Sequence, residues 1–249
     1  MSQLDALAAA VIAAPEDVAP RRAYAAAVKA TDPERAQLIE MQLAIRDQRR
    51  NGQEPPSSET TAARDLIKRK GRTWAGKLAD QVDYFMFWGG FVEEIELDAP
   101  KLISTGATFA KAAPLRHLRV RKLAGHVGSV ANLPVLEQIR SLDVASNRLR
   151  DVDIAELVRS PRLRHLRVLR INNNPEVGLD ALRAIARADL PDLQFVEAGQ
   201  TEAPLVIRSD DWGGGEPEVR WTRARATLVD ELGHLPWLDA REEPSPDAI

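Results

Sequence analysis

The histidines of this chain are candidates for a general base or for metal ligands. The sequence contains four histidines: His117, His126, His165 and His234. They form no HxxxH or HExxH arrangement, and the chain has no cysteine to complete a set of metal ligands. We therefore expect no metal site, and solvated or structural roles for these side chains.

Other catalytic signatures are also missing from the sequence. There is no G-x-S-x-G, Walker or dinucleotide-binding pattern. The glycines at 213–215 lack the following Lys-Ser/Thr that a phosphate loop needs, so they indicate a hairpin turn. Asp210, Asp211 and Glu216 lack the alternating spacing of a calcium loop. The sequence thus predicts a non-enzymatic protein with no cofactor and no small-molecule substrate.

Composition restricts the possible partners further. The 249 residues carry a formal charge of −3, with 44% hydrophobic and 29% charged residues, as in a globular protein. A near-neutral chain is unlike a typical polyanion binder. The basic residues at 64–77 could contact nucleic acid, but the solvated face of a helix explains them better. We expect no nucleic-acid partner.

The hydropathy pattern predicts no association with a membrane. No apolar run approaches the ~18 residues that span a bilayer. The apolar residues at 8–14 lack a preceding basic region, and Asp5 stands where that region would be, so they indicate a helix and not a signal peptide. We expect a cytoplasmic protein.

An aliphatic pattern recurs through the middle of the chain. Residues 139–149 match LxxLxLxxNxL, residues 166–177 repeat it, and looser copies lie on either side. The second aliphatic positions are Ile95, Leu118, Leu142, Leu169 and Leu193, at spacings of 23, 24, 27 and 24 residues. Leucine-rich repeats recur every ~20–29 residues. The pattern predicts an α/β solenoid, a short leucine-rich-repeat horseshoe of about five repeats.

In such a fold each repeat contributes one short strand, and stacked neighbours share a continuous core. Asn147 and Asn174 are expected at the turns, where a buried amide can pair with backbone groups. The other three copies have no asparagine there, so we expect an irregular solenoid. The return segments at 153–158 and 179–188 are expected to be partly helical.

The chain divides into four predicted regions. Residues 1–80 are expected to form a helical domain, in which Ser2 and Asp32 cap helices and Pro33 starts one. Residues 81–201 carry the repeats. Residues 202–241 are expected to close the solenoid with a hairpin, a helix at 225–232, and the side chains of Trp221 and Trp237. Residues 242–249 are expected to form a disordered tail.

The N-terminal segment resembles a known family. Its residues 13–21, Tyr24-Ala25 and residues 32–39 are similar to the repeat-companion domain that precedes leucine-rich repeats in many bacterial proteins, and residues 87–92 are similar to that family's aromatic-glycine segment. The family has an acidic residue and a tryptophan where this chain has Ala26 and Ala27. The resemblance implies a scaffolding or recognition role without catalytic residues.

The residues between the inward aliphatic side chains should form a column on the concave face. That column reads Glu96, Arg119, Asp143, Arg170 and Gln194, with His117, Arg121, Val168 and Asn172 beside it and Glu94 and Asp98 at the edge. Neighbouring strands lie ~4.8 Å apart, so the alternating charges can pair. The result is a nearly neutral, polar surface that suits a protein partner.

We therefore expect a scaffold or protein–protein interaction module that binds a protein partner through this concave face. Two alternatives remain: an inhibitor, immunity-type protein or small-GTPase modulator, and a structural subunit of a larger assembly. Charge reversal of Arg119 and Arg170 together should weaken binding to the partner if the face is the site.

Overall fold

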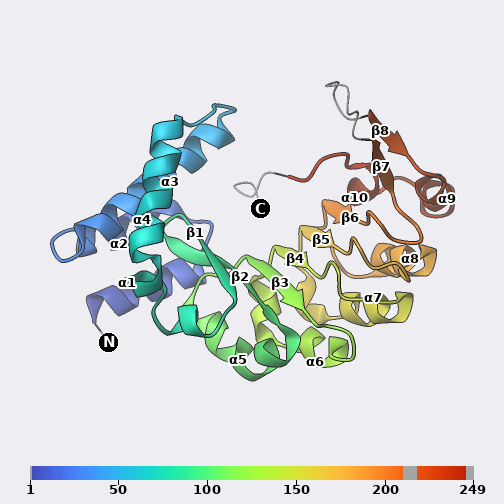
Figure 1. Cartoon of the computed structure of the whole chain (residues 1–249), viewed down its shortest axis with the longest axis horizontal. Coiled ribbons are helices and arrows are strands. Elements are labelled where there is room, and N and C mark those ends of the chain that lie inside the picture. Colours follow the sequence, from blue (N-terminus) through green and yellow to red (C-terminus); the bar gives the residue numbers. More distant parts are fainter. Residues whose placement is uncertain (1, 210–217, 245–249) are drawn as a thin grey trace.

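The computed structural model describes residues 2–209 and 218–244, and for 206–209 and 218–221 it describes the backbone alone. These residues form ten α-helices, three short 3-10 helices and eight strands. Figure 1 shows a row of strands with helices along one side, a helical layer at the N-terminal end and a small unit at the C-terminal end. Within the described ranges, no helix has both the length and the apolar character to span a bilayer.

The N-terminal layer consists of four helices whose ends follow from the sequence. Ser2 caps the first helix and forms a capping box with Asp5, Asp17 caps the second, and Asp32 caps the third, which begins at Pro33. The helices are α1 (Gln3–Ala13), α2 (Val18–Val28), α3 (Pro33–Arg50) and α4 (Ser57–Ala75), and the 3-10 helix η1 (Gly76–Asp80) follows.

The central sheet has six strands in sequence order: β1 (Tyr84–Trp88), β2 (Phe91–Asp98), β3 (His117–Arg121), β4 (Ser141–Asp143), β5 (Val168–Arg170) and β6 (Phe195–Glu197). β1 and β2 are antiparallel and the remaining pairs are parallel. The expected leucine-rich-repeat horseshoe is wrong. The sheet is mixed and open, and its strands vary from three to eight residues, so the chain is not built as a solenoid of equivalent repeats.

The register of the parallel strands follows the aliphatic pattern for four strands and departs from it at the fifth. Ile95, Leu118, Leu142 and Leu169 pair as direct neighbours, but Leu169 is followed by Val196. Leu193 is buried before the strand begins. Val196 therefore follows Leu169 by 27 residues, the same spacing that separates Leu142 from Leu169.

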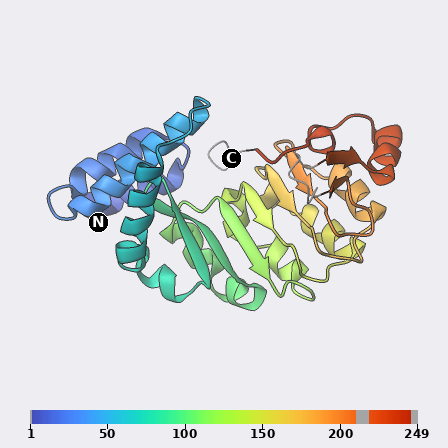
Figure 2. The same cartoon turned by 45° about the horizontal axis from the view of Figure 1, so that its top comes forward.

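Helices and short 3-10 segments connect the parallel strands and cover one face of the sheet (Figure 2). They are α5 (Ala99–Ala112), α6 (Val127–Ala131), η2 (Pro134–Gln138), α7 (Asp151–Val158), η3 (Pro161–Leu163) and α8 (Leu179–Arg187). The expected helices at 153–158 and 179–188 correspond to α7 and α8. The helix α5 was not predicted; it begins at Ala99, with Pro100 in its first turn, where the missing N–H of proline costs nothing.

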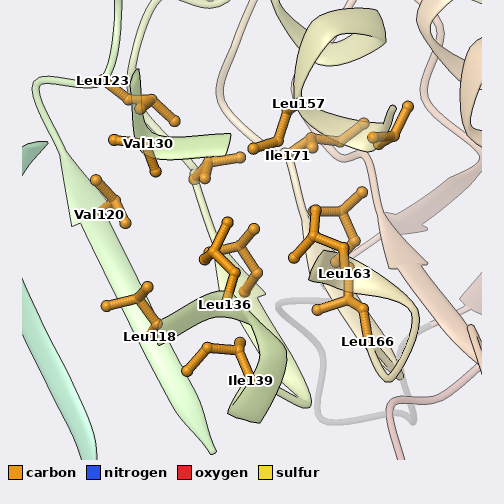
Figure 3. Close-up of a cluster of buried hydrophobic side chains, with 14 of the residues drawn as sticks. Leu118, Val120, Leu123, Val130, Leu136, Ile139, Leu157, Leu163, Leu166 and Ile171 are labelled. Carbon is orange, nitrogen blue, oxygen red and sulfur yellow. The ribbon is translucent and has the colours of Figure 1, made fainter. Parts of the chain in front are cut away.

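The core lies between the sheet and these connecting segments. Figure 3 shows Leu118 and Val120 of β3 facing Val130, Leu136 and Ile139. All five side chains are buried in one hydrophobic cluster that runs the length of the sheet. Burial of one such side chain contributes ~1.5–3 kcal/mol, so this cluster is the main source of the sheet's stability.

Two buried asparagines link successive turns after β4 and β5. Asn147 Oδ1 accepts the Leu123 backbone N–H at 2.8 Å, and its Nδ2 donates to the Val120 carbonyl at 2.8 Å. Asn174 Oδ1 accepts the backbone N–H groups of Asn147 and Leu149, each at 3.0 Å. The side-chain amides thus form hydrogen bonds with backbone groups that, because the chain bends after each strand, no longer pair with a neighbouring strand.

A small unit closes the C-terminal end of the sheet. It contains the hairpin β7 (Val206–Ser209) and β8 (Glu218–Trp221), α9 (Arg223–Leu232) and α10 (Pro236–Asp239). Trp237 is buried in the main core, as expected for a closing residue, whereas the Trp221 side chain and the glycine-rich turn lie outside the described part of the chain. The disordered tail is expected at 242–249, and its residues 245–249 also lie outside the described part of the chain.

Candidate functional site

The face of the sheet opposite the connecting helices carries most of the residues that the sequence singled out. We call it the open face, and its outward residues are Glu94, Glu96, His117, Arg119, Arg121, Ser141, Asp143, Val168, Arg170, Phe195 and Glu197. It lies between the N-terminal helical layer and the C-terminal unit (Figures 1 and 2).

A column of alternating charges runs across the open face. Arg119 lies 3.7 Å from Glu96 and 3.4 Å from Asp143, on the strands to either side. Arg170 lies 3.5 Å from Glu197. Glu197, and not the expected Gln194, occupies the fifth position, because β6 is displaced by three residues; Gln194 is exposed before the strand. The alternation therefore extends over five strands.

Arg121 forms a second cluster of ion pairs at the β2–β3 edge of the face. Its Nη2 lies 2.6 Å from Asp83, and its Nε lies 3.2 Å from Glu96 and 3.4 Å from Asp98. Lys122 contacts the same Asp98 at 2.6 Å, which lowers the pKa of that carboxyl. These exposed pairs contribute little stability individually, but they fix the side chains in place.

A depression of about 420 Å³ lies in the middle of the open face, and Tyr84, His117, Ser141, Asp143 and Arg170 contribute to its wall. His117 packs against Trp88 with ring centroids 6.2 Å apart. Burial, together with the nearby Arg116 and Arg170, lowers the pKa of His117 to about 3, so its ring is neutral at pH 7.

Carboxylates make the N-terminal wall of this depression. Burial raises the pKa of Glu94, whose carboxylate accepts a long hydrogen bond from Trp88 Nε1 at 3.5 Å. Burial and the charges of Glu94 and Glu96 raise the pKa of Tyr84. The depression thus alternates carboxylate acceptors with the guanidinium groups of Arg119 and Arg170, an arrangement suited to hydrogen-bonding a polypeptide.

The chain's own C-terminal segment covers the β5–β6 end of the open face. Ala240 packs on Val168 and Phe195, two apolar side chains that would otherwise point into solvent. Arg170 Nε donates to Glu243 Oε2 at 3.2 Å, and a second, shorter bond joins Arg170 Nη2 to Glu243 Oε1. Arg170 also donates to Ser141 Oγ at 2.9 Å. An extended segment with an acidic residue is therefore already seated on this face.

Of the residues expected on the concave face, Asn172 lies at its margin, and two of the remaining histidines lie elsewhere. Asn172 follows β5, and its Oδ1 is buried without a hydrogen-bond partner. His165 is exposed in a turn, with its Nδ1 3.2 Å from Asp192. His234 contacts Asp239 in the C-terminal unit. Among the described residues, no group of three or more His, Asp or Glu side chains could hold a metal ion.

Sequence reasoning missed a row of arginines at the start of the parallel strands. Arg116, Arg140 and Arg167 each stand directly before a strand, and backbone hydrogen bonds link them in that order at 2.8 and 2.7 Å. Glu16 Oε1, from the α1–α2 loop, lies 3.7, 3.4 and 3.7 Å from their guanidinium groups. Aligning the positions two residues before Leu118, Leu142 and Leu169 would have revealed this row.

Comparison of the chain with protein-family models, with curated proteins and with solved structures finds no match.

Proposed function

We propose that this protein is a non-enzymatic interaction module of the cytoplasm that binds an extended segment of a partner protein on its open face. The observation that carries this proposal is the seating of the C-terminal segment there, through Ala240 on Val168 and Phe195 and through Glu243 on Arg170. A partner segment with an acidic residue near a small apolar one would use the same contacts.

The charge arrangement supports a polypeptide partner. Because the column of charges pairs with itself, the face is nearly neutral overall and offers both donors and acceptors within one 420 Å³ depression. A polyanion would meet Glu94, Glu96 and Asp143 there, which disfavours it. An extended peptide, in contrast, can place its own charges against either sign.

A random peptide library displayed against the full chain tests this proposal. We expect selected peptides to be enriched in Asp or Glu beside small apolar residues. They should bind about tenfold more weakly to Arg119→Gln/Arg170→Gln, because a lost charge-assisted hydrogen bond is worth ~1.5–3 kcal/mol. Glutamine is used in place of an acidic residue, because charge reversal would put new carboxylates beside Glu96 and Asp143. Binding is measured by fluorescence anisotropy.

Arg159→Gln serves as the matched control, because this exposed arginine ends α7 on the opposite side of the sheet. The control should bind the selected peptides as the wild type does. Glu243→Gln should bind them more tightly, because it weakens the competing internal segment. If the library yields no enriched peptide, or the double variant binds the selected peptides unchanged, the open face is not the binding site.

A further inference from the structure

A second pocket lies where the helical layer meets the β1–β2 hairpin, and its lining includes Trp88, which also packs on His117 of the open face. It has a volume of about 230 Å³ and is bounded by α3, α4, β1 and the residues before β3. Its apolar lining consists of Ile45, Ala63, Ile67, Met86, Phe87 and Trp88. The polar part of the wall contains four arginines and one carboxylate, together with Gln42, Thr60 and Gly89; the charged residues are Arg46, Arg49, Arg64, Arg116 and Glu93.

Arg46 is the unusual member of this wall. Only 6% of the residue is exposed, yet its Nε and Nη2 have no hydrogen-bond partner. Arg116, 3% exposed, has an unpartnered Nε as well. Buried guanidinium groups normally have their donors paired, because unpaired buried donors are costly. Because two guanidinium groups with unpaired donors line the same pocket, we expect the pocket to bind a ligand that carries a hydrogen-bond acceptor.

The surrounding charges do not supply that acceptor. Glu93 is the buried carboxylate nearby, and its Oε1 is held by Arg21 at 2.7 Å, while Arg116 lies at 3.7 Å from its Oε2. Glu16 lies 3.7 Å from Arg116 and is shared with two further arginines. Burial lowers the pKa of both Arg46 and Arg116, and the nearby carboxylates oppose this shift without cancelling it.

We propose that this pocket binds a small organic anion, a carboxylate with an apolar body. Its carboxylate would accept from Arg46 and Arg116, and its apolar part would lie against Ile67, Phe87 and Trp88. The volume is below the ~300–1,000 Å³ of sites for drug-sized ligands, which disfavours a nucleotide. The six apolar side chains disfavour a bare inorganic anion.

Octanoate is the probe for this site, with 1-octanol as the uncharged molecule of equal length and inorganic phosphate as the anion without an apolar body. We expect calorimetry on the full chain to show one saturable octanoate site. Octanol and phosphate should each bind at least tenfold more weakly. Absence of octanoate binding at millimolar concentration, equal binding of octanol, or preference for phosphate would overturn the proposal.

Two variants locate the site. Arg46→Met removes the two buried N–H donors that lack partners and should reduce octanoate affinity at least tenfold. It should also raise the melting temperature of the empty protein, since a buried charged group with unsatisfied donors is replaced by an apolar side chain. Ala63→Leu keeps Arg46 but fills the pocket, and should reduce affinity similarly. Lys68→Met, an exposed cation on the same α4, is the control and should bind as the wild type does. Unchanged octanoate binding in both pocket variants would contradict the assignment.

Discussion

Glu243 and Arg170 form a two-bond ion pair across 73 positions of sequence, with Arg170 Nε donating to Glu243 Oε2 at 3.2 Å. Both side chains are partly buried, with 25% of Arg170 and 29% of Glu243 exposed. The pair fastens the chain that follows α10 to β5, and Figure 1 shows this segment returning from the C-terminal unit toward the sheet. The segment therefore limits access to one end of the open face.

Glu243→Gln should loosen this segment. A partly buried ion pair of this kind contributes ~1 kcal/mol, so the open form should become about fivefold more populated. Trypsin cleavage after Arg241, followed by mass spectrometry of the released peptide, should accelerate by the same factor. Glu242→Gln, the exposed neighbour, is the control. Equal cleavage rates in both variants would show that the ion pair does not hold the segment.

Asn174→Ala should destabilise the fold by ~2–4 kcal/mol. The substitution leaves the backbone N–H groups of Asn147 and Leu149 buried without an acceptor, and each unsatisfied group costs ~1–3 kcal/mol. Urea unfolding followed by circular dichroism measures the loss. Asn132→Ala, which removes one exposed hydrogen bond to Gly128, should cost less than ~1 kcal/mol. A loss no larger than this control would refute the role of the buried amide.

The aliphatic period predicted strand pairing better than it predicted the fold. It placed Ile95, Leu118, Leu142 and Leu169 on neighbouring strands because alternating buried side chains determine register. It carried no information about the lengths of the connecting helices, which range from the 14-residue α5 to the five-residue α6, or about the antiparallel β1. A horseshoe requires equivalent connections, so that expectation failed.

The candidate site was predictable only in part, for a related reason. Periodicity predicts Glu96, Arg119, Asp143 and Arg170 in one column, but it does not predict Glu197, because the leucine pattern gives 24 residues for the last interval and the strands are 27 apart. The pairing of Glu243 with Arg170 joins segments that no local pattern relates. The pocket around Arg46 likewise depends on how α3 and α4 pack on β1.

The stability of this protein should fall as the pH decreases below ~6.5. His117 has a pKa of about 3 in the fold, held down by burial and by Arg116 and Arg170, whereas an unfolded histidine has a pKa of ~6.5. Between these values the unfolded state binds the extra proton, so unfolding becomes easier by up to ~1.4 kcal/mol per pH unit.

His117→Gln should flatten this pH dependence between pH 6 and 4, as measured by urea unfolding at each pH. His165→Gln, at an exposed position, controls for the substitution itself. If His117→Gln and the wild type lose stability in parallel on acidification, the imidazole is not the group responsible.

Gly90→Ala should destabilise the protein more than the same substitution at Gly125. Both glycines have positive φ, +82° and +80°, so both variants incur a backbone cost of ~1 kcal/mol. A Cβ at Gly90 would lie 2.1 Å from Ile39 Cγ1 and 2.9 Å from its Cα, whereas Gly125 faces open space.

The difference in stability between Gly90→Ala and Gly125→Ala measures how closely the helical layer packs on the β1–β2 hairpin. The side chain of Gln42 in α3 accepts from the Gly90 N–H and donates to the Phe87 carbonyl, each at 2.7 Å, and so fixes the β1–β2 turn against the helix. Because neither backbone can retreat without breaking these bonds, Gly90→Ala should cost at least ~2 kcal/mol more than Gly125→Ala in thermal unfolding. Equal losses would mean that α3 moves freely over the hairpin, and the pocket between them would then lack a fixed shape.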